Sequence, residues 1–425
     1  MRLSNLAACA FSVCAVVEIL SGCSATQTPA VTPATLRADR VAPASSFNVL
    51  YRFRRAQGAW PQASLIDVNG TLYGTTSLGG ALRKGTVYTV TTTGTEKVLY
   101  SFAGSPDGSA PIANLVNVKG TLYGTTFSGG AGCGFGCGTV YSISPSGLEK
   151  VLYRFAAYSD GAFPTSHLLN VKGTLYGATV GGGGLGCKPS FGCGGTVYSI
   201  STTGVETVLY RFAGGSDGMY PVGDLINVNG TLYGTTAYGG GSGCVGGLGC
   251  GTVYTITTAG VEKVIYRFAG GSDGWHPEAG LIDVNGTLYG TTDYGGIYSL
   301  CGGGCGTVFS ISTSGNEHVL YRFGDSPDGA EPRTALINVK GTLYGATFEG
   351  GGSGCLENRG CGTVYSLSTN GTETVVHSFG ATNDGGNPAA ALFEMKGSLY
   401  GTAENGGGGQ KCAHVGCGVV FQLQP

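Results

Sequence analysis

The chain has 425 residues, and 81 of them are glycine. Only 11% are Asp, Glu, Lys or Arg, against roughly 25% in an average soluble domain, whereas 23 Tyr, 17 Phe and 2 Trp make the chain rich in aromatic residues. This composition excludes a solvated disordered chain and favours many short strands joined by tight turns. The formal net charge of −2 gives no electrostatic basis for binding nucleic acid or an anionic membrane surface.

Residues 1–22 have the features of a lipoprotein signal peptide. A basic start with Arg2 precedes a mostly apolar stretch, residues 6–20, which is too short to span a bilayer because a spanning helix takes about 20 residues. The segment from Leu20 to Cys23 resembles a bacterial lipobox, so Cys23 is the expected lipidation site. Glu18 departs from a good signal peptide, which leaves plain secretion with cleavage nearby as the alternative. Residues 23–46 are rich in Pro, Ala, Thr and Ser and predict a flexible tether.

One segment, GTLYG or its near copy GSLYG, occurs seven times. The copies begin at Gly70, Gly120, Gly173, Gly230, Gly286, Gly341 and Gly397. They are therefore 50 to 57 residues apart, a spacing that indicates propeller blades or a β-solenoid. Because the copies form an internal alignment, positions that recur can be compared with positions that vary.

Each unit contains four strand-like runs, which in the fourth copy are residues 225–228, 231–236, 251–256 and 262–268. Asn-Gly and Lys-Gly pairs supply the positive-φ residues that tight hairpins need. Residues 47–53 match the fourth run, whereas the chain ends on a third run at 418–423. Pairing these two ends would close a ring and remove an exposed sheet edge, for which a solenoid has no use. We therefore predict an all-β fold over residues 47–425, a seven-bladed β-propeller with four strands per blade, closed by the N-terminal strand.

The unit GTLYGTT…GG…GTVYSIS…VLYRF resembles the bacterial tandem repeat called GloVer, which is found in choice-of-anchor proteins. The resemblance covers residues 47–425, and all seven copies match. It implies a repeat protein attached to the cell surface, for which a lipobox anchor is suitable. The family implies no established biochemical activity.

Twelve of the 15 cysteines occur two per unit in units two to seven, always in the loop before the third run. The pairs are Cys133/Cys137, Cys187/Cys193, Cys244/Cys250, Cys301/Cys305, Cys355/Cys361 and Cys412/Cys417. Local pairing in an exported chain predicts disulfides that hold the shape of glycine-rich loops. Zinc is the alternative, but the pairs lie in different blades and have gaps of three to five residues, so we predict no metal.

The loops between runs two and three share one face of a propeller with the blade-to-blade loops. The blade-to-blade loops carry a proline, and the residues before it differ between copies. The candidate ligand face consists of Trp60, Phe163, Tyr220, Trp275, His276, Glu331 and Asn387. The neighbouring loops add Phe127, Phe191, Tyr238, Tyr294 and Phe348. Aromatic side chains on one face stack on sugar rings or hold a protein partner, and packing between blades is the alternative.

No catalytic constellation is found, because the five histidines occupy unrelated positions and no Ser–His–Asp order or phosphate loop stands in a fitting context. We expect no catalysis and no cofactor. A weaker alternative is a glycan-acting enzyme using carboxylates such as Asp217, Asp273 and Glu331 from separate blades. The expected protein is a monomeric, lipid-anchored module of the bacterial envelope that binds a polysaccharide or a protein. It is expected at the outer membrane, and otherwise in the periplasm or secreted. A mainly structural role is the alternative.

Overall fold

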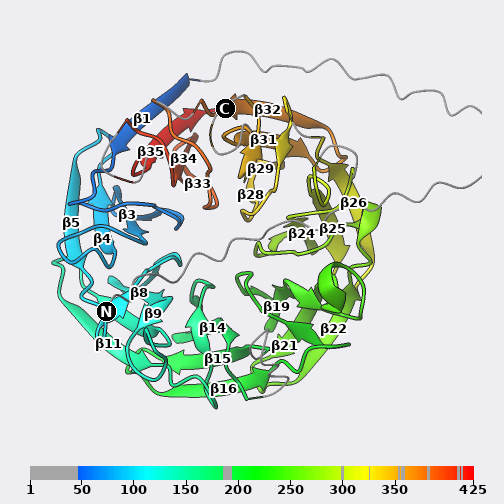
Figure 1. Cartoon of the computed structure of the whole chain (residues 1–425), viewed down its shortest axis with the longest axis horizontal. Coiled ribbons are helices and arrows are strands. Elements are labelled where there is room, and N and C mark those ends of the chain that lie inside the picture. Colours follow the sequence, from blue (N-terminus) through cyan, green and yellow to red (C-terminus); the bar gives the residue numbers. More distant parts are fainter. Residues whose placement is uncertain are drawn as a thin grey trace, which may run out of the picture. The chain divides into compact units, whose positions relative to one another are not determined.

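Seven small antiparallel sheets surround a central axis in the computed structural model of the chain (Figure 1). The structure describes residues 46–425, apart from 185–193, 298–300, 325, 353–354, 356–358, 381–382, 409–411 and 413–414. The predicted signal peptide and Cys23 lie outside the described residues, as does the predicted tether except for Ser46. Within the described residues, no helix is long and apolar enough to cross a membrane.

Each blade has four strands, which follow one another from the axis outward. Blade one consists of β2 (Ile66–Val68), β3 (Thr71–Thr76), β4 (Thr86–Val90) and β5 (Glu96–Ser101). Blade two consists of β7 (Val116–Val118), β8 (Thr121–Thr126), β10 (Thr139–Ile143) and β11 (Glu149–Arg154). Blade three consists of β13 (Leu169–Val171), β14 (Thr174–Gly181), β15 (Thr196–Ser201) and β16 (Glu206–Arg211). Blade four consists of β18 (Ile226–Val228), β19 (Thr231–Thr236), β21 (Thr252–Thr257) and β22 (Glu262–Arg267). Blade five consists of β23 (Ile282–Val284), β24 (Thr287–Thr292), β25 (Thr307–Ser312) and β26 (Glu317–Arg322). Blade six consists of β28 (Ile337–Val339), β29 (Thr342–Thr347), β31 (Thr363–Ser368) and β32 (Glu373–Ser378).

The seventh blade joins the two ends of the described chain. It consists of β33 (Phe393–Met395), β34 (Ser398–Ala403), β35 (Val419–Gln424) and β1 (Ser46–Arg52). β1 pairs antiparallel with β35, from Ser46 opposite Gln424 to Arg52 opposite Val419. The predicted seven-bladed propeller and its closure by the N-terminal strand are therefore confirmed.

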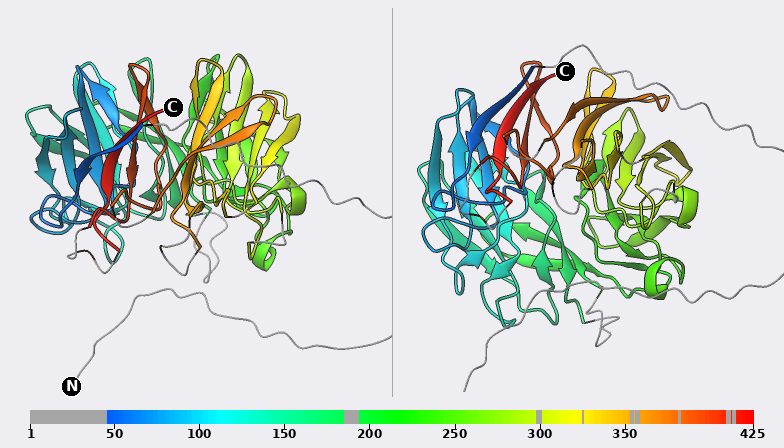
Figure 2. Two further views of the ribbon diagram at one scale, coloured as in Figure 1. Left: turned by 90° about the horizontal axis from the view of Figure 1, so that it is seen from above. Right: turned by 45° about the horizontal axis from the view of Figure 1, so that its top comes forward.

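The two faces of the ring differ (Figure 2). One face, termed the hairpin face, carries short turns; at Asn69 and Gly70 the φ angles are 55° and 83°, as a two-residue hairpin requires. The other face, termed the loop face, carries the blade-to-blade loops and the cysteine-bearing loops. The loop face also holds the short strands β6 (Gly108–Ser109), β9 (Ser128–Gly129), β12 (Ala162–Pro164), β17 (Gly218–Met219), β20 (Tyr238–Gly239), β27 (Gly329–Ala330) and β30 (Glu349–Gly350), and the 3₁₀ turns η1 (Val245–Gly247) and η2 (Gly271–Asp273).

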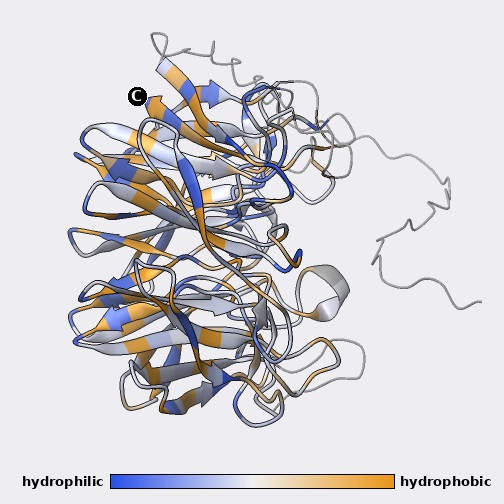
Figure 3. Cartoon of the chain, turned by 90° about the vertical axis from the view of Figure 1, so that its left-hand side faces the viewer, coloured by the Kyte–Doolittle hydropathy of each residue, from blue (hydrophilic) through white to orange (hydrophobic). Residues whose placement is uncertain are grey.

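The hydrophobic core lies between neighbouring blades. Hydrophobic and hydrophilic residues alternate along the strands (Figure 3), and both faces of each inner sheet are covered by the adjacent blades. Strand β21 shows the pattern: Val253 packs in a cluster with blade five, whereas Tyr254 and Ile256 pack in a cluster with blade three. A blade therefore has no core of its own and depends on its two neighbours.

A glycine in the second strand of each blade makes room for the aromatic ring of the third strand. Gly234 lies opposite Tyr254 in the ladder. A Cβ atom at Gly234 would lie 2.5 Å from the Tyr254 hydroxyl oxygen. The hydroxyl is fully buried and has no hydrogen-bond partner among the described residues. The last glycine of the GTLYG repeat is thus explained by side-chain packing.

The Asp-Gly turns are held by the tyrosine of the preceding strand. Tyr266 Oη lies 2.8 Å from Asp273 Oδ1 and 3.2 Å from Glu317 Oε2 of the next blade. The single hydroxyl proton of Tyr266 is therefore shared between the carboxylates of Asp273 and Glu317. Burial and the nearby Asp273 carboxylate raise the pKa of Glu317 to about 7. The glutamates at the same position in blades two to four have pKa values raised to about 7 for the same reasons: Glu149, Glu206 and Glu262.

Five of the six predicted disulfides are formed in the described residues: Cys133–Cys137, Cys244–Cys250, Cys301–Cys305, Cys355–Cys361 and Cys412–Cys417. Cys187 and Cys193 lie outside the described residues. The carbonyl of the second cysteine accepts a hydrogen bond from the next blade; Cys250 O, for example, accepts from His276 N at 2.9 Å. The disulfide loops thus position residues of the candidate ligand face.

Candidate functional site

The residue before the proline of each blade-to-blade loop has a left-handed backbone. The predicted ligand-face residues Trp60, Phe163, Tyr220, His276, Glu331 and Asn387, together with Ala110 in the second blade, have φ between 54° and 62°. Each donates its backbone N–H to the preceding blade and accepts a hydrogen bond at its carbonyl from its own blade, as His276 does from Asp293 N at 3.1 Å. These bonds fix the loop at the seam between two blades, so the strained backbone is held in place from both sides.

The predicted aromatic residues do not form a continuous exposed ring. Trp60, Phe163 and Tyr220 are partly exposed. Trp275 is only 8% exposed; its Nε1 donates to Gly303 O at 3.1 Å and its ring stacks on Tyr294 at 4.5 Å. Trp275 therefore packs against its own cysteine-bearing loop.

Aromatic side chains make contacts across two blade seams. Phe127 of blade two stacks on Phe163 of blade three, with ring centroids 5.1 Å apart. In blades four and five, Tyr238 lies between Tyr220 and His276, at 5.7 Å and 4.7 Å. Phe191 lies outside the described residues. Packing between blades thus accounts for much of the aromatic content of the loop face.

A cavity of about 360 Å³ opens where the loops reach the axis. It is lined by residues of all seven blades, mainly from the first and third positions after the proline. The first positions are Gln62, Ile112, Thr165, Val222, Glu278, Arg333 and Ala389, and lining residues at the third position are Ser64, Asn114, Asp224, Gly280, Ala335 and Ala391. These residues were not predicted from the sequence, in which the residues before the proline and aromatic residues of the neighbouring loops were singled out. Of the latter, Phe348 lines the cavity.

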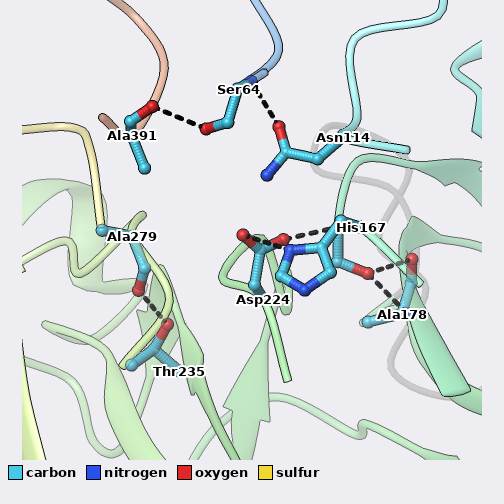
Figure 4. Close-up of polar contacts among 9 residues, drawn as sticks. Ser64, Asn114, His167, Ala178, Asp224, Thr235, Ala279 and Ala391 are labelled. Atoms are coloured by element: carbon cyan, nitrogen blue, oxygen red, sulfur yellow. Dashed lines mark hydrogen bonds and ion pairs between the residues drawn. The ribbon is translucent and has the colours of Figure 1, made fainter. Parts of the chain in front are cut away.

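Polar side chains connect neighbouring blades around the axis (Figure 4). Ser64 Oγ donates to Ala391 O at 2.8 Å, and Asn114 Oδ1 accepts from Ser64 N at 2.6 Å. His167 and Asp224 form a closed pair, with Nδ1 2.7 Å from Oδ2, while Asp224 Oδ1 accepts from His167 N at 2.7 Å. Charge interaction and hydrogen bonding with Asp224 outweigh burial and raise the pKa of His167. Contacts between neighbouring blades thus hold most of this half of the cavity wall, while Thr165 Oγ1 is buried without a hydrogen-bond partner among the described residues.

The opposite half carries a cluster of charges from blades five and six, formed by His276, Glu278, Asp293, Glu331 and Arg333. His276 Nδ1 lies 3.6 Å from Glu278 Oε1 and 3.5 Å from Asp293 Oδ2. Arg333 Nε lies 3.3 Å from Asp293 Oδ2, and Arg333 Nη2 lies 2.6 Å from Glu331 Oε2. Arg333 also lies over the Phe348 ring, 4.4 Å from its centroid. These five residues are hereafter called the charged cluster, and two of them, Glu278 and Arg333, line the cavity.

The cluster holds more negative than positive charge. Burial raises the pKa of Glu331 to about 7, although Arg333 acts in the opposite direction. Burial and the Asp293 carboxylate raise the pKa of Glu278. Burial also raises the pKa of Glu404, whose Oε2 accepts from Gln62 Nε2 at 2.8 Å across the ring closure. One guanidinium therefore faces four carboxyl groups at this end of the cavity.

The comparison with protein families identifies the repeat. The family model of the Gloeobacter/Verrucomicrobia repeat matches residues 40–248 and 245–425. The chain belongs to this repeat family. The GloVer resemblance expected from the GTLYG units is therefore confirmed, and the matched residues form a seven-bladed propeller in this protein. No curated protein matches the chain.

Solved structures resemble this repeat protein at low sequence identity. A GH74 enzyme from Niastella koreensis is 12% identical with a TM-score of 0.50, over 83% of this chain and 52% of that one. A PQQ-bound aldose sugar dehydrogenase from Streptomyces coelicolor is 14% identical with a TM-score of 0.44, over 90% and 99%. A gluconolactonase from Xanthomonas campestris is 14% identical with a TM-score of 0.41, over 89% and 89%. Only the first of these reaches a TM-score of 0.50, and at 12% identity its likeness bears on the fold alone.

Proposed function

We propose that this repeat protein is an exported, lipid-anchored module of the bacterial envelope that binds a polysaccharide at the axial cavity of its loop face. The observation that supports the proposal is the contrast between the repeated strands and the cavity wall. The seven copies keep nearly the same residues in their strands, as TLYGTT does in blades one, two, four and five. The wall, in contrast, has a different residue from each blade at the first position after the proline.

A ring with sevenfold repetition needs no such variation for its own stability. The first positions after the proline include an amide, a hydroxyl, two ions of opposite charge and three aliphatic side chains. The charged lining residues Asp224, Glu278, Arg333 and Glu404 come from blades four to seven, whereas blades one to three contribute uncharged residues, so the wall has no sevenfold symmetry. Variation of this kind on a concave, half-buried surface is typical of a ligand site.

The chemistry of the wall suits sugar hydroxyls. Glu278 and Glu404 offer acceptors, while Arg333 and Gln62 offer donors; the Phe348 ring adds an aromatic surface beside them. Sugars need both acceptors and donors, with an apolar surface for the C–H face of the ring. The volume of about 360 Å³ lies within the roughly 300–1,000 Å³ of small-molecule pockets. A cavity of this size holds one end or one unit of a polysaccharide.

The binding proposal is tested on a polysaccharide and glycan array with the full chain, solubilised in detergent. We expect binding that falls at least tenfold in Arg333→Lys, because the bidentate guanidinium fork is lost and a hydrogen bond to a charged group contributes about 1.5–3 kcal/mol. In Gln62→Ala we expect a severalfold fall, because a neutral hydrogen bond contributes about 0.5–1.5 kcal/mol. Lys150→Ala is the matched control, since Lys150 is exposed on the outer strand β11. If the chain binds no glycan on the array, or if both cavity variants bind as well as the wild type, the proposal is overturned. A protein ligand or a structural role is then favoured.

The anchor is tested separately. Growth of a producing bacterium with a clickable fatty acid should label the wild-type chain and leave Cys23→Ser unlabelled. Secretion of an unlabelled wild-type chain would contradict lipid anchoring and support the alternative of plain secretion.

A further inference from the structure

We propose that the charged cluster contains a site for a divalent transition-metal cation, held by His276 Nδ1 and the carboxylates of Glu278 and Asp293. The site stands on the geometry of these three side chains and does not depend on the polysaccharide proposal. The three residues come from one blade: His276 and Glu278 flank Pro277 in the blade-to-blade loop, and Asp293 follows β24.

The spacing of the ligand atoms fits a small cation. Zinc lies about 2.0–2.2 Å from imidazole nitrogen and carboxylate oxygen, so two ligands of a tetrahedral ion are roughly 3.3 Å apart. His276 Nδ1 lies 3.5 Å from Asp293 Oδ2 and 3.6 Å from Glu278 Oε1. One ligand atom from each of the three residues falls within a common span of 4.8 Å. Small rotations of the carboxylates would bring all three to coordination distance.

Two buried ligand atoms in the cluster lack a hydrogen bond to any described residue. These are His276 Nδ1 and Asp293 Oδ1. The His276 side chain is 10% exposed and the Asp293 side chain is 2% exposed. A buried polar atom without a partner costs about 1–3 kcal/mol, and the distances of 3.5 Å and 3.6 Å from Nδ1 to the neighbouring carboxylates are too long for a good hydrogen bond. A cation would satisfy both atoms at once.

The charge balance also favours a cation. With their carboxyl groups ionised and with His276 neutral, as a metal-binding imidazole is, Glu278, Asp293, Glu331 and Glu404 carry four negative charges against the positive charge of Arg333. A divalent cation reduces this excess. Arg333 keeps its contacts with Glu331 at 2.6 Å and with the Phe348 ring when Asp293 turns to the cation. A nitrogen ligand with two oxygen ligands suits zinc or manganese better than calcium, which prefers six to eight oxygens.

No other blade repeats this ligand set in its sequence. The positions of His276, Glu278 and Asp293 are held in blade four by Tyr220, Val222 and Ala237, and in each remaining blade at most one of the three is a His, Cys, Asp or Glu. The His167–Asp224 pair across the cavity is closed by its own ion pair at 2.7 Å and by the hydrogen bond from His167 N to Asp224 Oδ1. The cation site is therefore assigned to blade five.

The test is a calorimetric titration of the untagged full chain, treated with EDTA, with Zn²⁺ and with Mn²⁺ in the absence of any glycan. We expect one cation per chain for at least one of the two metals, with the fluorescence of the adjacent Trp275 changing in step. Asp293→Asn and Glu278→Gln should each weaken binding at least tenfold. His377→Gln is the matched control, because His377 Nε2 lies 3.4 Å from Asp384 Oδ2 in a pair that has no third ligand in the described residues.

The outcomes separate this site from the other proposals. Absence of binding up to millimolar metal, or equal binding by wild type and by both carboxylate variants, would overturn the cation site. If Asp293→Asn unfolds, Glu278→Gln decides alone, because Glu278 lies at the partly exposed rim. If the wild-type chain binds metal but no glycan, the cation site is supported and the polysaccharide proposal is refuted.

Discussion

The buried tyrosine hydroxyl of the third strand provides a sharp test of the packing between blades. Tyr254 is fully buried, and its hydroxyl lies against Gly234 without a hydrogen-bond partner in the described residues. Blade five has Phe309 at the same place, also fully buried. An unsatisfied buried hydroxyl costs about 1–3 kcal/mol. Tyr254→Phe removes this cost and leaves only a void of one oxygen atom, so we expect the free energy of unfolding to rise by about 1 kcal/mol.

The assay is differential scanning calorimetry at fixed scan rate. An unfolding entropy of roughly 2.1 cal/mol/K per residue over about 380 residues makes 1 kcal/mol equal to about 1 °C in Tm. The same hydroxyl is buried and unpartnered among the described residues in four further blades, at Tyr88, Tyr141, Tyr198 and Tyr365. Because these sites lie in different blades, their effects should add. A variant with all five tyrosines changed to phenylalanine should therefore melt about 5 °C higher.

Tyr266→Phe is the matched control. Its hydroxyl contacts Asp273 and Glu317 at 2.8 Å and 3.2 Å, so its loss should lower Tm. The reverse change, Phe309→Tyr, should also lower Tm, because it introduces a hydroxyl beside Gly290. A fall in Tm for Tyr254→Phe as large as that for Tyr266→Phe would refute the reasoning and show that the buried hydroxyl is bonded, for example to water.

Three further predictions concern the ring. Tm should rise as pH falls from about 8 to 5, because folding raises four glutamate pKa values from 4.5 to about 7 and the folded state therefore binds more protons than the unfolded chain in that range. Replacing the four glutamates by glutamine should flatten this dependence of Tm on pH. A Tm that falls over this range would contradict the prediction. Gly234→Ala should lower the free energy of unfolding by about 1–3 kcal/mol, since its Cβ would lie 2.5 Å from the Tyr254 hydroxyl. Chemical denaturation measures this free energy, and an unchanged denaturation midpoint would contradict the close packing. Deleting residues 46–52 should produce aggregation in size-exclusion chromatography because the edge of β35 is then exposed, whereas the exposed substitution Asn48→Ala on the same strand should leave a monomer.

Much of the fold was predictable because the sequence of one blade occurs seven times in the chain. The Asn-Gly turn at Asn69 and Gly70 appears in every copy as Asn-Gly or Lys-Gly, and its left-handed backbone follows from local chemistry. The mismatch between a spare fourth strand at residues 47–53 and a missing one at the end predicted closure by β1. The cysteine pairs were predictable for the same local reason, since their partners are four to six residues apart.

The candidate site was only partly predictable. His276 and Glu331 were singled out from their positions before a proline, but their partners Glu278, Asp293 and Arg333 were not. Asp293 is 17 residues from His276 in the chain, and Arg333 belongs to the next blade. Trp275 was a candidate for the ligand face, with packing as the alternative, and the structure packs its ring on Tyr294. Distances across a blade seam depend on how the sheets pack, and no sequence period reports them.

The sequence by itself determined the strands, the turns, the number of blades and the joining of the two ends, because these depend on local backbone preference and on repetition. Only the tertiary structure decided which side chains meet at the axis. There the seven loops converge, so residues that are 50 or more positions apart become neighbours, and one guanidinium comes to face four carboxyl groups in a cavity that no single repeat contains.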